Sequence, residues 1–510
     1  MAKAIHQSQS TGLRNKVQLI AYPNRMGSNL KDLRRILDYY LGRAIGGVHI
    51  LPLYPSNADG GFSPLTHKEV DPAYGSWDDV EDIANQFDLC MDLIMNHISD
   101  DSEQFKDFIK HGQQSRYAGL FLDVDALGPI TREDLAKIHI FKEKEPFREI
   151  QFGDGSKGRV WCTFTENQID LNYQSPQTFA LLEDYMQYLM DRGVKLFRLD
   201  ACGYVTTRIG TSCFLVEPEI YDILTHFKRI AESRGAHILP EVHHNYTYQH
   251  AIASRGMYAY GFALPMLLLD AFLSKDSIYL ESWLRICPHH QLTILDTHDG
   301  ITITNAEGLL PQEHIDRVVE DVSDRSGDPL LLGSAADVDS VGAIHQLTTT
   351  YYDALRRNNT AYLASRAVQF FTPGIPQVYY MGLLCATNDR ELCEKTGEAR
   401  DINRSFFSIE DIEERMQQPV VRQLIHLMQF RSFYPAFEGR FNLHYSDRHE
   451  VLMSWRKGEF FTQLHVNFRD ISFSIRYFDV ILQSEVELDL RGSSSTPGSI
   501  IPDHPLSQMP

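Results

Sequence analysis

The stretch GVKLFRLDACGY, residues 193–204, decides the fold of this chain. Its first half is mostly apolar and predicts a buried strand, and Arg198 and Asp200 lie close together where that strand ends. Parallel α/β barrels place their reactive side chains at this carboxyl end of the strands. An Arg-x-Asp pair by itself is more often a structural ion pair, so the interpretation depends on how the other strands end.

Other segments have the same form, a short apolar run followed by charged or amide side chains: DLCMDLIMNH (88–97), HILPE (237–241) and LTILDTHD (292–299). Taken singly, Glu241 fits the cap of a following helix and Asp299 fits the start of a turn. A barrel, however, brings the ends of separate strands together. We therefore expect Asp200, Glu241 and Asp299 to share one site with His97 and His298.

Strand-like and helix-like runs alternate along most of the chain, which is the pattern of βα units. The fold class that we predict is α/β, a (β/α)8 TIM barrel with two inserted subdomains and a C-terminal antiparallel β domain. The expected boundaries are a flexible leader at 1–13, a catalytic barrel built from 14–97, 172–300 and 357–439, inserted subdomains at 98–171 after strand 3 and at 301–356 after strand 7, a β domain at 440–492 and a flexible tail at 493–510.

The composition is that of a large globular protein. The chain has 510 residues, of which 43% are hydrophobic and 23% charged. A net charge of −20 disfavours nucleic acid and anionic membranes as partners, and the sequence has no apolar run of the length, about 18 residues, that predicts a membrane span. The segment MAKAIHQSQSTGL lacks the apolar core of a secretory signal. The cysteines are scattered without metal-site spacing, so we expect reduced thiols and a cytoplasmic location.

The motifs at the strand ends follow one another in a recognisable order: DLIMNH (92–97), FRLDACGY (197–204), ILPEV (238–242) and LDTHDG (295–300). They resemble the four sequence blocks of glycoside hydrolase family 13, the α-amylase clan, and QIDLN (168–172) resembles a fifth. Longer segments resemble the sucrose phosphorylase subfamily in particular, namely 46–80, 210–219, 352–382 and 400–404.

The resemblance implies a role for each matching residue. Asp200 matches the family's nucleophile, Glu241 its general acid/base and Asp299 its transition-state stabiliser. Arg198 would hold Asp200 ionised, because an adjacent guanidinium favours the carboxylate form. The other matches concern the glucose pocket: hydroxyl-binding histidines at His97 and His298, a pair that closes the far end at Asp59 and Arg404, and aromatic walls at Phe62 and Phe164, for which a plain core role is the alternative.

Retaining glycosyl transfer needs such a set of carboxylates. One ionised carboxylate attacks the anomeric carbon, and a second, protonated and about 5 Å away, protonates the leaving oxygen. In a phosphorylase, inorganic phosphate then accepts the glucosyl group. An anion that enters a site with three carboxylates needs local donors. The candidates are Gln346, whose position resembles the acceptor loop, its neighbour His345, His243 beyond Glu241, and the cations Lys142, Lys144 and Arg148 of the first insertion.

The loops around the acceptor position depart from the sucrose phosphorylase pattern. The pair His345-Gln346, the segment IHIFKEKEPF (138–147) and the pair Asp100-Asp101 together resemble glucosylglycerol phosphorylases. Two carboxylates near the acceptor would suit a small neutral polyol and would repel fructose 6-phosphate. We therefore expect reversible phosphorolysis of 2-O-α-glucosylglycerol to α-glucose 1-phosphate and glycerol.

Several alternatives stay open at this point. Sucrose is the alternative donor, and sucrose 6-phosphate another, because Lys142 and Lys144 would attract a phosphorylated fructose. A plain α-glucoside hydrolase would share the same catalytic residues. A non-enzymatic binding protein on this fold would be expected to lack Asp200 or Glu241, and both are present. The resemblance also implies no cofactor, no metal and a possible homodimer.

Overall fold

The computed structural model describes residues 12–140, 145–326, 330–333 and 344–490. Its centre is a sheet of eight parallel strands in the order β10-β11-β15-β1-β2-β3-β8-β9. A hydrogen bond of 3.2 Å from Tyr258 N to Ile238 O joins the two edges, so the sheet is a nearly closed barrel, as predicted. The strands are β1 (Gln18–Ala21), β2 (Gly47–Ile50), β3 (Asp88–Ile94), β8 (Val194–Asp200), β9 (His237–Pro240), β10 (Ala259–Gly261), β11 (Gln291–Thr293) and β15 (Ile375–Tyr379).

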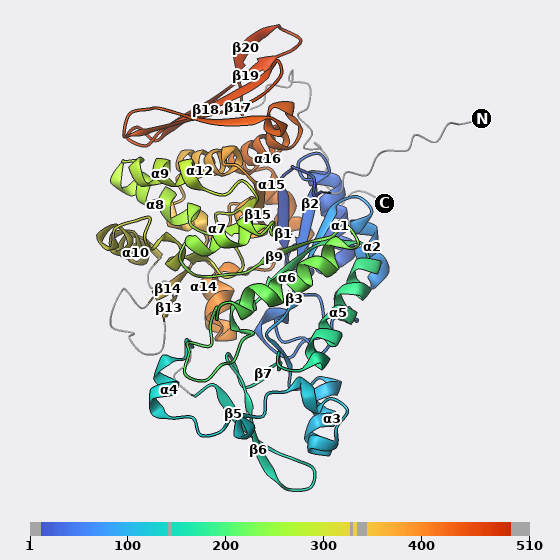
Figure 1. Cartoon of the computed structure of the whole chain (residues 1–510). Coiled ribbons are helices and arrows are strands. Elements are labelled where there is room, and N and C mark those ends of the chain that lie inside the picture. The colour runs from blue at the N-terminus through green and yellow to red at the C-terminus, as the bar shows by residue number, and fades with distance from the viewer. Residues whose placement is uncertain (1–11, 141–144, 327–329, 334–343, 491–510) are drawn as a thin grey trace, which may run out of the picture.

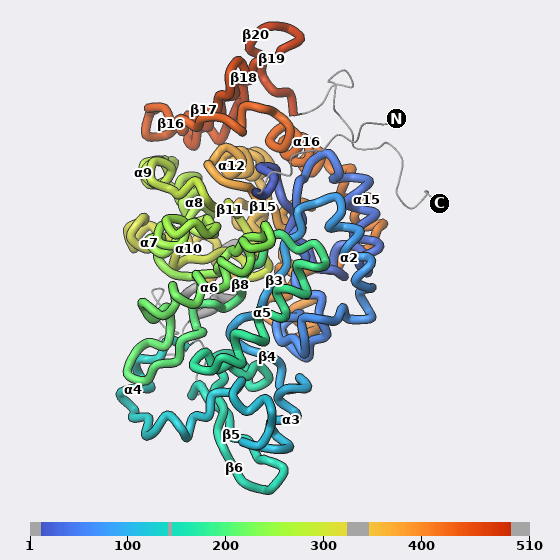
Figure 2. The backbone as a smooth tube through the Cα atoms, turned by 45° about the vertical axis from the view of Figure 1, so that its right-hand side comes forward, coloured from blue at the N-terminus to red at the C-terminus, as the bar shows by residue number. Residues whose placement is uncertain are grey.

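Helices surround this barrel and shield its strands from solvent (Figures 1 and 2). Local signals fix their ends: the Asn29 side chain accepts from the backbone N–H groups of Lys31 and Asp32 at 3.0 Å, and Ser175 caps the helix that Pro176 begins. The helices are α1 (Leu30–Ile36), α2 (Trp77–Ala84), α5 (Pro176–Asp191), α6 (Glu219–Glu232), α7 (Thr247–Ser254), α8 (Leu264–Ser274), α9 (Ile278–Ile286), α12 (Asn359–Phe371), α13 (Tyr380–Leu383), α14 (Arg390–Thr396), α15 (Ile409–Met416) and α16 (Pro419–Phe433).

The central strands are buried on both faces, because side chains fill the barrel inside and helices cover it outside. Every residue of β3 is buried, and in β8 only Lys195 is exposed. Parallel pairing aligns the strand ends: Ile94 lies opposite Asp200, and Leu199 lies opposite Pro240, the residue before Glu241. This register brings the sequence motifs to one end of the barrel.

Two insertions cover that end. The first contains β4 (His97–Ser99), α3 (Glu103–His111), α4 (Arg132–Lys137), β5 (Phe147–Gln151), β6 (Lys157–Trp161) and β7 (Gln168–Asp170), and it lies at the end of the molecule away from the C-terminal sheet (Figure 1). The second contains β12 (Ile301–Thr302), α10 (Gln312–Ser326), β13 (Leu330–Gly333), β14 (Ile344–Thr348) and α11 (Tyr351–Ala354). The candidate cations Lys142 and Lys144 lie outside the described residues, as does the side chain of His345.

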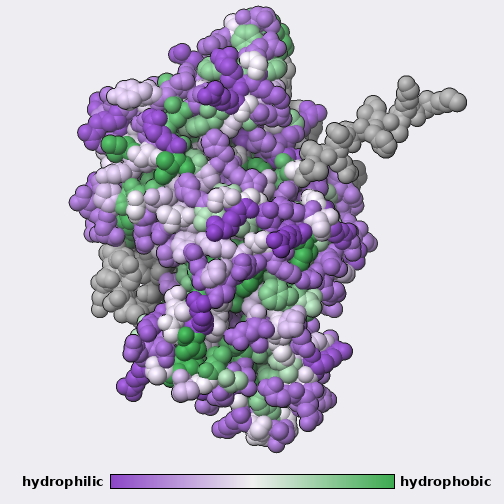
Figure 3. All heavy atoms as spheres, viewed as in Figure 1, coloured by the Kyte–Doolittle hydropathy of each residue, from purple (hydrophilic) through white to green (hydrophobic). Residues whose placement is uncertain are grey.

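An antiparallel sheet of five strands follows the barrel, as predicted. It consists of β16 (Arg440–His444), β17 (Glu450–Lys457), β18 (Phe460–Asn467), β19 (Ser472–Asp479) and β20 (Ser484–Glu487). The Trp455 indole donates to the carbonyl of Phe371 at 2.8 Å, which fixes the sheet on α12. The face in Figure 3 is mainly hydrophilic, with hydrophobic residues in small areas. Within the described ranges, every helix is too short or too polar to cross a membrane.

Candidate active site

A pocket of about 210 Å³ opens where the barrel strands end, between the two insertions. Its walls combine acidic, basic and aromatic side chains, and most of the residues expected from the sequence are among them. They are Asp59, Phe62, His97, Phe164, Gln168, Asp200, Ala201, Gly203, Tyr204, Phe214, Glu241, His243, His298, Asp299, Thr302, Gln346 and Arg400. Strand ends far apart in the sequence therefore supply one site.

Arg198, on β8, is the cation beneath the pocket floor. Only 3% of its surface is exposed, and its guanidinium contacts three carboxylates. Nη1 donates to Asp200 Oδ1 at 2.8 Å and also to Asp92 Oδ1, while Nη2 donates to Glu241 Oε1. Glu241 accepts two more hydrogen bonds, from the backbone N–H of Ala201 at 3.1 Å and from His243 Nε2 at 2.9 Å. One guanidinium charge is thus shared among three buried acids.

This sharing changes the expected protonation of the pair. Burial raises the pKa of Asp200 well above its usual value, and the negative charge of Glu241 adds to that rise although Arg198 opposes it. Burial acts in the same direction on Glu241, but Arg198 and His243 outweigh it and lower the pKa of Glu241. The charge of Arg198 therefore favours the ionised form of both acids, while burial and the repulsion between Asp200 and Glu241 oppose it at Asp200. The two carboxyl groups titrate as a pair, and the role of Arg198 in keeping Asp200 ionised stays a prediction.

Two arginines stand at the opposite end of the pocket. Arg404 lies 3.5 Å from Asp299 Oδ1 and 3.8 Å from Asp59 Oδ1, and Arg400 lies 3.4 Å and 3.5 Å from the same two atoms. Arg404 Nε also donates to the carbonyl of His298 at 3.0 Å. Burial would raise the pKa of Asp299, but His298, Arg400 and Arg404 lower it, so Asp299 stays ionised. The far end of the pocket is therefore a closed, charge-balanced network.

The expected aromatic walls and histidines lie beside this network. Phe62 stacks on His298 with ring centroids 4.8 Å apart and an angle of 6° between the planes. His97 contacts Phe164 edge to face at 5.4 Å, and its Nε2 lies 2.8 Å from the carbonyl of Phe62. Burial lowers the pKa of His97 to about 4 and that of His298 to about 3. Both imidazoles are neutral near pH 7 and can exchange hydrogen bonds with hydroxyl groups.

The second insertion reaches Glu241 through hydrogen bonds. His243 Nε2 contacts Glu241, and His243 Nδ1 lies 3.1 Å from the hydroxyl of Thr302 on β12. Thr302 pairs with Gln346 of β14, and Gln346 faces the pocket. His345 is on β14 as well. The candidate acceptor residues His243 and Gln346 therefore lie together on one wall.

The candidate acceptor residues of the first insertion, Asp100, Asp101 and Arg148, are absent from the described lining of the pocket. Asp100 Oδ2 accepts from Arg148 Nη1 at 2.8 Å, and Asp101 Oδ1 lies 3.0 Å from Lys106 Nζ. The Asn57 amide donates to both acids, at 2.8 and 3.1 Å. The expectation that Asp100 and Asp101 suit a small neutral polyol stays a prediction, and each acid pairs with a neighbouring cation in this structure.

Sequence reasoning missed several pocket residues. Arg400 begins the motif RDINR, in which the family resemblance indicates a role for Arg404 alone, and Gln168 begins QIDLN. Gln168 Nε2 donates to the carbonyl of Phe62 at 3.1 Å. Tyr204 and Phe214 form an aromatic wall beside Phe164, with Tyr204 rings 5.0 and 4.7 Å from the other two. Each lies inside a segment already recognised, but a motif match does not say which of its side chains face a cavity.

Glu241, His243 and Asp299 are the described residues whose ligand atoms lie close enough for a metal, within 4.8 Å of one another. Glu241 already accepts from Arg198 and His243, and Asp299 is balanced by two arginines. A divalent cation would have to displace these side-chain partners from Glu241 and Asp299. A metal-free site stays the prediction.

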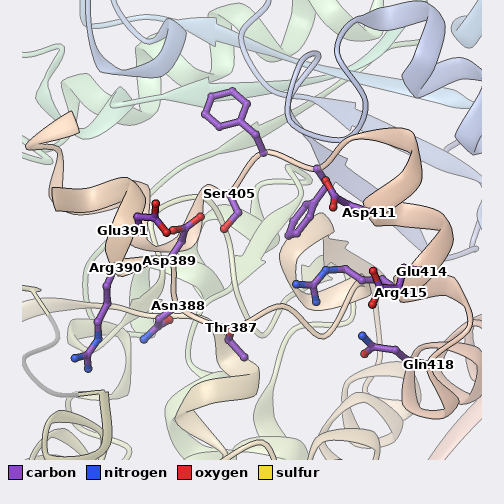
Figure 4. A pocket seen from close by; sticks show the side chains of 12 residues that line it. Thr387, Asn388, Asp389, Arg390, Glu391, Ser405, Asp411, Glu414, Arg415 and Gln418 are labelled. Carbon is purple, nitrogen blue, oxygen red and sulfur yellow. The ribbon is translucent and has the colours of Figure 1, made fainter. Parts of the chain in front are cut away.

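A second cavity, of about 490 Å³, lies beside α14 and α15 (Figure 4). It is lined by charged and amide side chains, including Asp389, Glu391, Asp411 and Arg415. The described site residues gather in the other pocket. Among the described residues, the two linings share none, although Ser405 of the second cavity follows Arg404 in the chain.

Comparison with known proteins finds matches along most of the chain. The alpha amylase catalytic domain matches residues 21–279. Glucosylglycerol phosphorylase of Marinobacter adhaerens is 57% identical over 468 residues, which cover 92% of this chain and 98% of that protein. Sucrose phosphorylase of Streptococcus mutans is 37% identical over 478 residues, with 92% and 99% coverage.

Solved structures give the same result for the fold. The crystal structure of sucrose 6F-phosphate phosphorylase from Thermoanaerobacter thermosaccharolyticum matches with a TM-score of 0.90 and 38% identity, and covers 94% of this chain and 100% of that one. The arrangement of barrel, insertions and C-terminal sheet is therefore shared with a characterised relative.

Proposed function

Because this chain belongs to the alpha-amylase family, glycoside hydrolase family 13, and within it to the sucrose phosphorylase subfamily, we propose that it is a retaining α-glucoside phosphorylase. The best-supported reaction is the reversible phosphorolysis of 2-O-α-glucosylglycerol to α-glucose 1-phosphate and glycerol. The observation that carries this proposal is the 57% identity to glucosylglycerol phosphorylase over nearly the whole of both chains.

In the first half of the proposed reaction, Asp200 attacks the anomeric carbon and the bond to glycerol breaks. Glu241 gives a proton to the departing glycerol oxygen, so the products are a glucosyl ester of Asp200 and neutral glycerol. The oxocarbenium-like transition state carries positive charge, which the ionised Asp299 stabilises at the sugar hydroxyls. Phe62, His97 and the buried arginines would hold the glucosyl ring at the closed end of the pocket.

This step requires Asp200 to be ionised and Glu241 to be protonated. In the ligand-free pocket, burial and the charge of Glu241 raise the pKa of Asp200, while Arg198 and His243 lower the pKa of Glu241, so the bound substrate must favour the opposite distribution. A glucoside bound between the two carboxyl groups removes water from both and places its glycosidic oxygen against Glu241. We infer that binding transfers the proton to Glu241 and leaves Asp200 as the carboxylate that attacks.

In the second half, Glu241, now a carboxylate, takes a proton from inorganic phosphate, whose oxygen attacks the anomeric carbon of the glucosyl ester. The bond to Asp200 breaks, which releases its carboxylate and leaves Glu241 protonated as at the start.

Phosphate must approach an acidic pocket, so it needs donors on the acceptor wall. We propose His243, Thr302 and Gln346, which line the pocket, as these donors. The aromatic wall of Tyr204 and Phe214 would keep water away from the ester, which favours phosphate over hydrolysis.

The donor panel is the direct test of the substrate. The enzyme is supplied with 2-O-α-glucosylglycerol, sucrose or sucrose 6-phosphate, each with inorganic phosphate, and the initial rate of glucose 1-phosphate release is measured. We expect the highest kcat/KM with glucosylglycerol. A higher value with either sucrose would keep the catalytic mechanism and reject glycerol as the acceptor.

We also propose a cytoplasmic location, since all seven cysteines, which lie in the described ranges, are free thiols. A homodimer stays a proposal from the family resemblance. Light scattering on a size-exclusion column tests it, and a mass near the 58.5 kDa of one chain would reject it.

A further inference from the structure

Asp92 is a carboxylate to which the proposed reaction gives no role. It lies on β3 with 0% of its side chain exposed, opposite Arg198 in the register of β3 and β8. Its Oδ1 accepts from Arg198 Nη1, the same nitrogen that donates to Asp200. Asp92 therefore competes with Asp200 for one end of the guanidinium.

His49, on β2, contacts the other side of Asp92. Its Nε2 lies 2.8 Å from Asp92 Oδ2, and only 1% of His49 is exposed. Arg198 and His49 together lower the pKa of Asp92 although burial raises it, so Asp92 is ionised. Since an ionised carboxylate only accepts hydrogen bonds, Nε2 must be the donor. The bond is thus a charge-assisted one inside the barrel.

Among the described groups around Asp92, His49 is the one besides Arg198 that donates a hydrogen bond to its carboxylate. Besides His49 and Arg198, the described ionisable side chains that interact with the charge of Asp92 include Asp200, whose pKa that charge raises, and a group of buried tyrosine, cysteine and histidine side chains. Burial raises the pKa of Tyr54, Cys90 and Tyr260 and lowers that of His67 and His298 to about 3. In the described part of the chain, the side-chain hydrogen bonds of Asp92 go to His49 and Arg198.

We propose that His49 is a positioning residue for the reaction: by holding Asp92 Oδ2, it keeps that carboxylate from drawing the Arg198 guanidinium away from Asp200. His49 acts through Asp92 and Arg198 and does not touch the substrate. Without its donor, Asp92 would depend on Arg198 alone. The guanidinium would then turn further toward Asp92, and Asp200 would be harder to ionise.

The test compares two substitutions of His49 by their pH profiles. His49→Leu removes the donor, while His49→Gln keeps an N–H at about the position of Nε2. This inference rests on the proposed function, so kcat/KM for the glucosyl donor is measured from glucose 1-phosphate release between about pH 4 and 8. The acid limb of kcat/KM reports ionisation in the free enzyme. His67→Leu is the control, because His67 is an equally buried imidazole that accepts the N–H of Ile94 at 3.2 Å.

We expect His49→Leu to move the acid limb up by about one pH unit, a loss of about ten-fold in kcat/KM below the limb. His49→Gln should stay within about two-fold of wild type, and His67→Leu should lower kcat/KM equally at every pH. An unshifted limb in His49→Leu, or a Gln variant no better than the Leu variant, overturns the proposal.

Failure of a variant to fold and failure of the proposed function can each be told apart from failure of the role of His49. If His49→Leu does not fold, His49→Met, which also lacks a donor, takes its place and the same criteria hold. If the wild-type enzyme releases free glucose instead of glucose 1-phosphate, the proposed function has failed. The role of His49 is then read from the pH profile of glucose release, because Asp200 attacks in both reactions.

Discussion

Glu241→Gln separates the proton-transfer role of Glu241 from its electrostatic effect on Asp200. The amide cannot protonate a leaving alcohol, so glucosylglycerol should lose about 10³-fold in kcat/KM, within the range of general acid catalysis. Glucosyl fluoride needs little protonation, since fluoride leaves as an anion. We expect that donor to retain its kcat/KM within about ten-fold.

The same substitution removes a negative charge that raises the pKa of Asp200. Two unit charges at the spacing of about 5 Å found in retaining enzymes repel by about 3 kcal/mol in an effective dielectric of about 20, which corresponds to about two pKa units. Arg198, which contacts both acids, then faces one competitor fewer. The pKa of Asp200 should fall, and the acid limb should move to lower pH by about one unit or more.

The assay is glucose 1-phosphate release from both donors with the wild-type enzyme and the Glu241→Gln variant, at several pH values. For either donor, kcat/KM covers the steps up to the glucosyl ester of Asp200. Equal losses with glucosylglycerol and glucosyl fluoride would refute the role of Glu241 as the acid. An acid limb that stays in place, or rises, would refute the electrostatic coupling to Asp200.

Four further substitutions follow from the geometry. Gly300→Ala should lower the free energy of unfolding by several kcal/mol, because φ is +96° and the new Cβ would lie 2.3 Å from Leu347 O. Gly308→Ala, with φ +78° but a nearest atom at 3.5 Å, should lower it by about 1 kcal/mol. Equal losses for the two variants in denaturant unfolding would contradict this reasoning. Asp59→Asn removes the charge that faces two arginines and should raise KM for glucosylglycerol about ten-fold. An unchanged KM would show that Asp59 does not contribute to binding of the glucosyl group. Phe214→Ala opens the aromatic wall and should increase free glucose relative to glucose 1-phosphate; a constant product ratio would show that the ring does not exclude water.

The sequence predicted the barrel and the main site residues because both depend on local patterns. The apolar run before Asp200 and the similar runs before Glu241 and Asp299 are strand signals, and parallel pairing brings their ends together. The antiparallel C-terminal sheet followed from alternating runs in the same way. The roles of these residues and the domain boundaries stay predictions.

What the sequence did not predict depends on side-chain partners across strands. Arg198 was expected to pair with Asp200, but the register also places Asp92 beside it, so that three acids share its guanidinium. Asp100 pairs with Arg148, which is distant in sequence, and the sequence did not predict this ion pair. Such pairings depend on tertiary geometry and leave no local signal.

Double displacement requires that the glucosyl group pass from glycerol to Asp200 and then to phosphate, with overall retention of the anomeric configuration. Proton and phosphorus NMR can follow the conversion of 2-O-α-glucosylglycerol and inorganic phosphate, and they identify the product and its anomeric form. We expect α-glucose 1-phosphate and glycerol in equal amounts. Free glucose as the main product would identify a hydrolase, and β-glucose 1-phosphate would contradict the double displacement.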